Sequence, residues 1–372
     1  MFEIRPLSNE TLALIPDTWH IRGVMNSPAP ADLAYQDEIL QGVSRTFALT
    51  IPQLPDALEQ VVGNAYLLCR IADTIEDDKH LPYADKREFS ERFIKVVNGG
   101  EDAQQFALDL HPRLSPTATA DEHDLIRNTP AVIRVTHSFN ERQQAALQRC
   151  IRIMADGMSR YQEADVAQGL KDQQDMDNYC YYVAGVVGEM LTELFCDYSS
   201  AIDENHDELM QLAVSFGQGL QMTNILKDIW DDQKRNMCWL PQSVLEDYGV
   251  FLDGAPLRNG KEFQQALGHL IGVARMHLGN ALKYTLLLPG NETGIRRFCL
   301  WALGMAVLTL RNINRRRGFT SGDEVKISRR SVRATVISTN LLTRHDFMLR
   351  WLFNGLAAGL PAACSLRSSC RA

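Results

Sequence analysis

The chain has 372 residues, of which 45% are apolar and 23% charged, the composition of an ordinary soluble globular protein. Its net charge of −8 argues against nucleic acid as a partner, because the summed field repels phosphate backbones. The eight cysteines form no CxxC pair, and the nine histidines show no HxxxH or HExxH spacing. We therefore expect reduced thiols and no zinc site.

Prolines and apolar periodicity divide the chain into an irregular start and a long series of helices. Residues 1–35 are punctuated by prolines such as Pro16, Pro28 and Pro30, and a helix is expected from about Asp37. No proline occurs between Pro130 and Pro241, and apolar residues there recur at i, i+3 and i+4, which predicts long helices. The main expected helices span residues 54–79, 85–98, 138–168, 175–198, 206–233, 260–287, 291–317 and 328–360.

No alternation of strand and helix patterns is found, so the predicted fold is all-α, a single large helical bundle. We divide the chain into an irregular N-terminal segment (1–36), an all-α domain (37–345) and an apolar C-terminal tail (346–372). The tail contains Arg350, Asn354 and Pro361, and its apolar run is shorter than the ~20 residues that a spanning helix needs. This favours a packed or interfacial terminal helix.

Two acid-rich stretches, 73-DTIEDD-78 and 228-DIWDD-232, lie about 150 residues apart inside apolar segments. Residues three and four apart share one face of a helix. The two groups that result are Asp73, Glu76 and Asp77 in the first stretch and Asp228, Asp231 and Asp232 in the second. Like charges at this spacing repel, and a hard divalent cation removes the repulsion. We therefore expect Mg²⁺, or Mn²⁺ in its place, at these six carboxylates, shared with a diphosphate.

Each acidic stretch continues a polar stripe along its helix. The stripes are Tyr66, Arg70, Asp73 and Asp77 in the first helix and Gln221, Asn224, Asp228 and Asp232 in the second. Apolar residues flank both stripes, which is typical of helices that line a wet central cavity. An acidic pattern alone is also typical of a solvated helix face with lysine partners.

The stretch 179-YCYYVAGVVGEMLTELF-195 has small residues at positions 184, 185 and 188 of an otherwise strong helix. Each interior glycine costs about 1 kcal/mol relative to alanine, so something must approach this backbone closely. One explanation is tight packing against another helix. The other is a groove for an extended hydrocarbon, lined at i,i+4 steps by Tyr179, Val183 and Val187.

Four motifs occur in order along the chain: 44-SRTF-47, 66-YLLCRIADTIEDD-78, 179-YCYYVAGVVGEML-191, and 217-GQGLQMTNILKDIWDDQ-233 followed by 239-WLP-241. Together they resemble the squalene/phytoene synthase family, most closely its squalene synthases, over roughly residues 37–345. The resemblance implies a bundle of the isoprenoid synthase type. It also implies a farnesyltransferase that joins two farnesyl diphosphates head to head through presqualene diphosphate and reduces this intermediate with NADPH, feeding sterol or hopanoid formation.

The same resemblance implies roles for individual residues. Asp73, Asp77, Asp228 and Asp232 hold the Mg²⁺ that stabilises the leaving diphosphate. Contacts to the diphosphate come from Ser44, Arg45, Arg70 and Asn224. Tyr179 lies where a proton leaves as the cyclopropane closes, with the released diphosphate sharing the role of base. The prenyl pocket, which keeps water from the cations, consists of Phe47, Tyr66, Val183, Val187, Gly188, Leu191, Gln221 and Phe298.

For NADPH, no GxGxxG motif follows a strand, so a Rossmann fold is not expected. The basic run 311-RNINRRRGFTSGDEVKISRR-330 resembles the cofactor segment of squalene synthases, with Lys326, Arg329 and Arg330 as the implied contacts. The sequence departs from the family at Ser328, where a basic residue is usual, and after 298-FCLW-301, where Pro-Gln is missing. A solvated face or a docking surface for anionic headgroups also explains the basic run.

Three alternatives remain beside a squalene synthase. A phytoene- or dehydrosqualene-type synthase omits the reduction. A non-catalytic isoprenoid-binding member is disfavoured because all four outer aspartates are present, and a terpene cyclase is disfavoured by the SRTF and YxxxVAGxVG elements. We expect farnesyl diphosphate as the ligand and a monomer in the cytoplasm, with peripheral contact at the inner face of a membrane.

Overall fold

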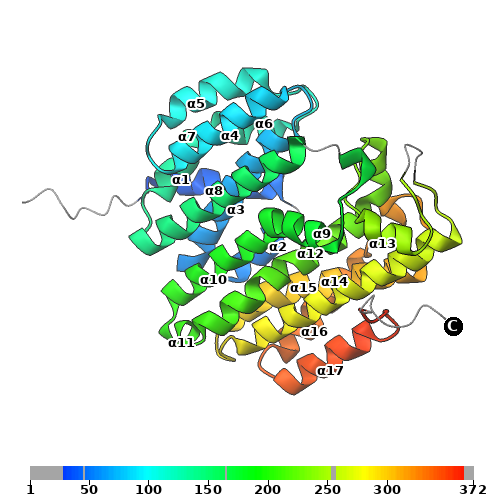
Figure 1. Ribbon diagram of the computed structural model, residues 1–372. Helices are drawn as coiled ribbons and strands as arrows, with labels where there is room; N and C mark the ends of the chain where they lie inside the picture. Colours follow the sequence, from blue (N-terminus) through cyan, green and yellow to red (C-terminus); the bar gives the residue numbers. More distant parts are fainter. Residues whose placement is uncertain (1–27, 45–46, 164–165, 253–256, 364–372) are drawn as a thin grey trace, which may run out of the picture.

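The computed structural model of the protein describes residues 28–44, 47–163, 166–252 and 257–363. Within these ranges the fold is all-α without a β-strand, and one isolated backbone bridge joins Leu170 to Pro241 (Figure 1). The α-helices are α1 (Pro30–Val43), α2 (Phe47–Thr50), α3 (Asp56–Asp77), α4 (Tyr83–Val97), α5 (Ala103–Leu110), α6 (Ala120–Arg127), α7 (Thr129–Thr136), α8 (Glu141–Glu163), α9 (Gln173–Cys180), α10 (Val186–Tyr198), α11 (Ser200–Asp203), α12 (His206–Lys234), α13 (Gln242–Asp247), α14 (Lys261–Leu287), α15 (Thr293–Arg315), α16 (Arg329–Leu342) and α17 (Asp346–Ala357).

The predicted all-α class is confirmed, and the long helices α3, α8, α12, α14 and α15 lie where apolar periodicity placed them. Two predicted helices are interrupted. The helix expected at 175–198 contains a π-helical turn at Tyr181–Gly185, and the one expected at 328–360 breaks between α16 and α17. Helix α1 begins at Pro30 and not near Asp37, because proline fits the first helical turn, where its missing N–H is not needed.

Three short helices, α5 to α7, occupy the region between 98 and 138 where the sequence analysis placed none. Local signals for two of them are present. Asp102 accepts a hydrogen bond from the Gln105 N–H at 2.7 Å and begins α5. Thr119 and Glu122 form a reciprocal capping box at the start of α6. These helices are too short for a long apolar repeat to predict them.

Two hydrophobic clusters form the core. One contains Phe89, Phe93 and Phe195 and is built around α3, α4, α8 and α10, and the other is built around α12, α14 and α15. The half-buried side chains of Val183 and Phe216 pack against both clusters. The two clusters therefore meet where residues 179–195 pack against α12.

Glycines allow α10 and α12 to approach each other at backbone distance. A Cβ atom added to Gly188 would lie 2.3 Å from the carbonyl oxygen of Ala213, and one added to Gly217 would lie 2.1 Å from that of Ala184. Real Cβ atoms do not come this close to backbone. Tight helix packing is thus a correct explanation for the small residues in this stretch.

The C-terminal helices cover one side of the bundle. α17 packs against α14, α15 and α16, and the side chain of Asp346 at its start pairs with the fully buried Arg296 of α15. Among the described helices, α15 alone is long and apolar enough to cross a membrane, and more than half of its most apolar part is buried inside the protein, as in a core helix.

Candidate active site

A cavity of about 280 Å³ lies between α3, α10, α12 and α15. Its wall is mainly apolar, and it includes all eight residues expected in a prenyl pocket: Phe47, Tyr66, Val183, Val187, Gly188, Leu191, Gln221 and Phe298. The polar lining comes from the two predicted stripes, with Arg70 and Asp73 from α3 and Gln221 and Asn224 from α12. The two helices therefore do face one shared cavity, as the stripes predicted.

Hydrogen bonds hold Arg70 at this cavity, but one of its N–H groups remains without an acceptor. Its Nη2 donates to the Tyr66 hydroxyl at 3.1 Å, and that hydroxyl donates to the carbonyl oxygen of Val43 at 3.0 Å. Its Nη1 lies 4.0 Å from the Glu122 carboxylate, a loose ion pair. The buried Nε–H has no hydrogen-bond partner. A guanidinium fixed at one edge with an unused buried donor suits an anionic ligand.

Asp73 lies next to Arg70 and lines the same cavity. The pKa of Asp73 is raised to about 7, mainly by burial, with Arg70 opposing the shift and the nearby carboxylates of Asp77 and Glu122 adding to it. The protein alone therefore gives the ionised form of this carboxyl group little stabilisation. An added cation would stabilise its ionised form.

The other acids of the first stretch point to different surroundings. Asp77 is at the solvent-facing end of α3, where partial desolvation raises its pKa and Arg235 and Lys86 oppose the rise. Glu76 borders a small void beside Ser90, between α3, α4 and α8. Asp77 therefore stays close enough to Asp73 to raise its pKa, whereas Glu76 also borders a separate void.

Asp78, the last acid of the first stretch, is a loop anchor. Its carboxylate accepts hydrogen bonds from the backbone N–H groups of His80, Leu81 and Ser115 at 2.7, 2.9 and 2.6 Å. It thereby ends α3 and ties the following loop to the segment before α6. The negative charge of Asp78 is therefore stabilised by hydrogen bonds within the protein.

The second acidic stretch, on α12, is partly paired with its own basic neighbours. Lys227 lies 3.1 Å from Asp228, and Lys234 lies 2.7 Å from Asp231 and helps to lower the pKa of that carboxyl group. Asp232 is buried and pairs with Arg235, and burial raises its pKa despite that partner. The pattern of a solvated face with lysine partners thus describes Asp228 and Asp231, and only Asp232 is enclosed.

The two acidic stretches nevertheless converge. Arg235 is within electrostatic range of Asp77 on α3 and of Asp228 and Asp232 on α12. Tyr179 is likewise within range of Glu76, Asp77 and Asp232. Among the described residues, no three His, Cys, Asp or Glu side chains lie close enough together to hold a metal ion by themselves. The arrangement is one in which ligand oxygens would have to complete any coordination shell.

Tyr179 is buried between these acids and a stack of aromatic rings. Its ring lies 4.0 Å from the ring of Trp239 in a nearly parallel stack, and 5.2 Å from that of Tyr161. Burial raises the pKa of Tyr179 well above its usual value, and the three nearby carboxylates add to the rise. Tyr179 is not among the residues that line the 280 Å³ cavity, so the predicted line through Tyr179, Val183 and Val187 holds only for the two valines.

Sequence reasoning missed Arg235 and Trp239 as site residues. Arg235 follows Asp232 by three residues and lies directly after the last residue of α12, a spacing that indicates an ion pair. Trp239 was noted only as part of the motif 239-WLP-241. Trp239 and Asp232 also line a second cavity of about 180 Å³.

The remaining predicted contacts are placed as follows. The hydroxyl of Ser44, the residue after α1, accepts a hydrogen bond from the Phe47 N–H at 3.0 Å, and Arg45 lies outside the described residues. Lys326 pairs with Asp323, while Arg329 and Arg330 are exposed at the start of α16. The turn before them touches the second acidic stretch, because a Cβ at Gly322 would lie 3.0 Å from the Asp228 carboxylate.

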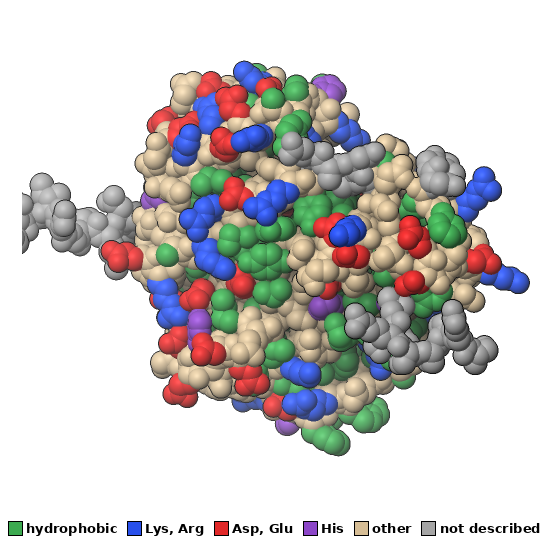
Figure 2. Space-filling view, in the orientation of Figure 1, with side chains coloured by type: hydrophobic (Ala, Val, Ile, Leu, Met, Phe, Trp, Pro, Cys, Tyr) green, Lys and Arg blue, Asp and Glu red, His purple; other side chains and the backbone are tan. Residues whose placement is uncertain are grey.

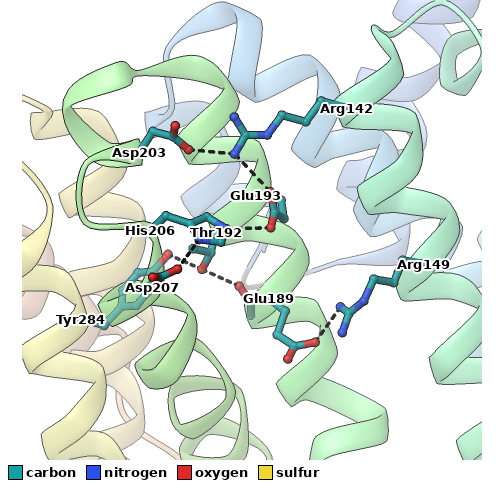
Figure 3. Close-up of polar contacts among 10 residues, drawn as sticks. Arg142, Arg149, Glu189, Thr192, Glu193, Asp203, His206, Asp207 and Tyr284 are labelled. Carbon is teal, nitrogen blue, oxygen red and sulfur yellow. Dashed lines mark hydrogen bonds and ion pairs between the residues drawn. The ribbon is translucent and has the colours of Figure 1, made fainter.

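The outer side of α10 is held by ion pairs (Figure 3). Arg149 of α8 pairs with Glu189 at 2.7 Å, and Arg142 contacts Glu193 at 3.2 Å. On the inner side, the Thr192 hydroxyl hydrogen-bonds the hydroxyl of the cavity residue Tyr284 at 2.9 Å. Figure 2 shows apolar side chains across the middle of this face of the molecule, with charged side chains around them.

A family model described as squalene/phytoene synthase matches residues 40–331. The chain belongs to the squalene/phytoene synthase family. Botryococcus squalene synthase from Botryococcus braunii is 31% identical over 289 residues, which cover 75% of this chain and 57% of that protein. Squalene synthase 1 from Arabidopsis thaliana is 30% identical over 277 residues, covering 73% and 63%. The chain thus aligns with less than two thirds of the length of these relatives.

Solved structures agree with this membership. The complex of TcSQS with the ligand BPH1237 is 25% identical, with a TM-score of 0.69, and the match covers 91% of this chain and 94% of that one. A dehydrosqualene synthase is 17% identical with a TM-score of 0.60 and shows a likeness of fold alone. The predicted isoprenoid synthase bundle is therefore confirmed. In this member of the squalene/phytoene synthase family the described parts of the recognised motifs fall on α2, α3, the α9–α10 segment and α12.

Proposed function

We propose that the protein is a squalene synthase that joins two farnesyl diphosphates head to head and reduces the presqualene diphosphate formed. The observation that carries this proposal is the meeting of Arg70 and Asp73 with Gln221 and Asn224 at the polar lining of one apolar cavity. Family membership supports the same chemistry. An apolar wall suits the farnesyl chains, and the polar lining suits their diphosphates.

The carboxylates around the polar lining fit a divalent cation. Asp73, Asp77 and Asp232 all have raised pKa values that burial or desolvation causes, and Arg235 is within range of carboxylates from both acidic stretches. Mg²⁺, or Mn²⁺ in its place, held by Asp73, Asp77, Asp228 and Asp232 would neutralise the diphosphate as its carbon–oxygen bond breaks. Arg70 would donate its unused Nε–H to a diphosphate oxygen.

After the first diphosphate leaves, the allylic cation adds to the double bond of the second substrate, and loss of one proton closes the cyclopropane. Tyr179 stays protonated because of its raised pKa, so its Oη–H holds the position of the released diphosphate, which accepts the proton. Phe47, Val187 and Phe298 keep water from the cation.

NADPH would supply hydride for the second step. Arg329 and Arg330 are exposed at the start of α16, shortly after the turn that touches Asp228, and in our proposal they hold the cofactor phosphates together with Lys326, released from Asp323. We also propose that the enzyme is a cytoplasmic monomer with peripheral contact at the inner face of a membrane, since its substrate and product are lipids.

Product analysis with and without reductant tests the proposal. The purified chain, given farnesyl diphosphate and Mg²⁺, should consume NADPH and yield squalene by gas chromatography and mass spectrometry, and Asp73→Asn protein serves as the inactive control. The same hydrocarbon with and without NADPH would instead identify a non-reducing synthase of the phytoene or dehydrosqualene type. A cyclised single-farnesyl product, or no product, would refute head-to-head synthesis.

A further inference from the structure

The outer side of α16 and α17 carries large apolar side chains in contact with water. Ile337 and Leu341 of α16 are 60% and 73% exposed, and Phe347 and Trp351 of α17 are 81% and 71% exposed. In each pair the two residues are four apart, so they share one face of their helix. Single exposed apolar residues are common, but four large ones on two adjoining helices form a patch, here called the α16–α17 face.

Helix α17 is apolar on two sides. Its inner side contributes Leu349, Leu352 and Phe353 to an apolar groove of about 210 Å³ between α15, α16 and α17. Its outer side carries Phe347 and Trp351, which no described part of the chain covers. The inner side of α17 is packed against the rest of the protein. Its outer side exposes two large aromatic side chains that still lack an apolar environment.

The charge beside this face is basic. Residues 329–363 contain five arginines and a single acidic residue, Asp346, in a chain whose net charge is −8. Asp346 is already paired with the buried Arg296. Arg344 and Arg350 are exposed next to Leu341 and Trp351 at i+3 and i−1 spacing. Aromatic residues flanked by arginines at the edge of an apolar face are typical of interfacial helices on anionic lipid.

We propose that the α16–α17 face docks the protein on an anionic bilayer surface. Phe347 and Trp351 enter the boundary between headgroups and acyl chains, and Arg344 and Arg350 bind lipid phosphates. This names the surface for the membrane contact proposed above and rests on that part of the proposed function. A second copy of the chain fits less well, since a symmetric pairing would bring the arginines of both copies together.

Vesicle flotation with the full chain, without substrate, tests this docking. The protein should float with vesicles of phosphatidylcholine plus phosphatidylglycerol, bind phosphatidylcholine vesicles weakly, and dissociate at high salt. Phe347→Ser/Trp351→Ser and Arg344→Gln/Arg350→Gln variants should each bind at least about tenfold less. Leu108→Ser is the matched control, because Leu108 is 60% exposed on α5, at the opposite end of the molecule (Figure 1), and should leave binding unchanged.

Three results would overturn the proposal: no binding of the wild-type chain to anionic vesicles, wild-type binding by the Phe347→Ser/Trp351→Ser variant, or a wild-type dimer in sedimentation velocity that this variant dissociates. Circular dichroism should show that each variant keeps its helical fold. Turnover of detergent-dispersed farnesyl diphosphate is measured separately. A Phe347→Ser/Trp351→Ser variant that loses vesicle binding but keeps turnover supports the docking face. A wild-type chain that binds vesicles but shows no turnover contradicts the proposed reaction alone.

Discussion

Replacing Asp73 with asparagine should stabilise the folded protein while abolishing turnover. Burial raises the pKa of Asp73 from 3.8 to about 7, so its ionised form is disfavoured in the native state. Each pKa unit corresponds to 1.36 kcal/mol, and ionised Asp73 therefore costs at most about 4 kcal/mol of folding free energy above pH 7. Asparagine keeps the shape of the side chain and carries no charge.

The sign of the effect fixes its pH dependence. Between pH 4 and 7 the native state binds more protons at Asp73 than the unfolded state, so the contribution of Asp73 to the unfolding free energy falls as pH rises through this window. The stabilisation in Asp73→Asn should reach about 1–4 kcal/mol at pH 8, and at pH 5 it should be less than half as large.

Urea denaturation at pH 5 and pH 8 without divalent ions measures this difference. Asp156→Asn, at an exposed position on α8, is the matched control and should show no pH-dependent gain. Added Mg²⁺ should then stabilise the wild type more than Asp73→Asn. A variant that is destabilised at pH 8, or equally stabilised at both pH values, would show that Asp73 is not held in a poorly compensated site.

Further substitutions separate metal binding, proton transfer and packing. Asp228→Asn should keep the fold and lower kcat at least ~10²-fold, and near-normal rates would contradict the metal assignment. Tyr179→Phe should keep the stack on Trp239 and slow presqualene diphosphate formation in single-turnover assays, so unimpaired formation excludes a role for the hydroxyl. Gly217→Ala should destabilise the protein by about 1–3 kcal/mol in urea, because its Cβ meets a backbone carbonyl. Gly279→Ala is its control, with open space at the Cβ position, and should be neutral or stabilising.

The sequence predicted those parts of the site that depend on a single helix. Positions 66, 70 and 73 on α3, and 221 and 224 on α12, share a face because the helical repeat fixes their relative directions, and all of them line the cavity. The same repeat placed Val183, Val187 and Leu191 together on the opposite wall. In these cases local geometry was sufficient.

Contacts between distant segments could not be predicted in this way. Asp78 has the same helical context as Asp77, yet the N–H of Ser115 binds it in the folded chain. The stack of Tyr179 on Trp239 joins residues on different elements. The π-helical turn at Tyr181–Gly185 has an i→i+5 repeat, so the regular i,i+4 spacing does not apply between Tyr179 and Val183, and of the two only Val183 lines the cavity.

The backbone contact between α10 and α12 limits how the substrate cavity could change during evolution. Carbonyl oxygens at Ala184 and Ala213 already touch glycine positions on the neighbouring helix, so these two walls cannot move closer, and parting them would open a void in the core. For the proposed reaction, preference for longer or shorter prenyl chains would thus be most readily altered at protruding side chains such as Leu191 and Phe298. Substitutions at these two residues are therefore the ones to test for a change in product size.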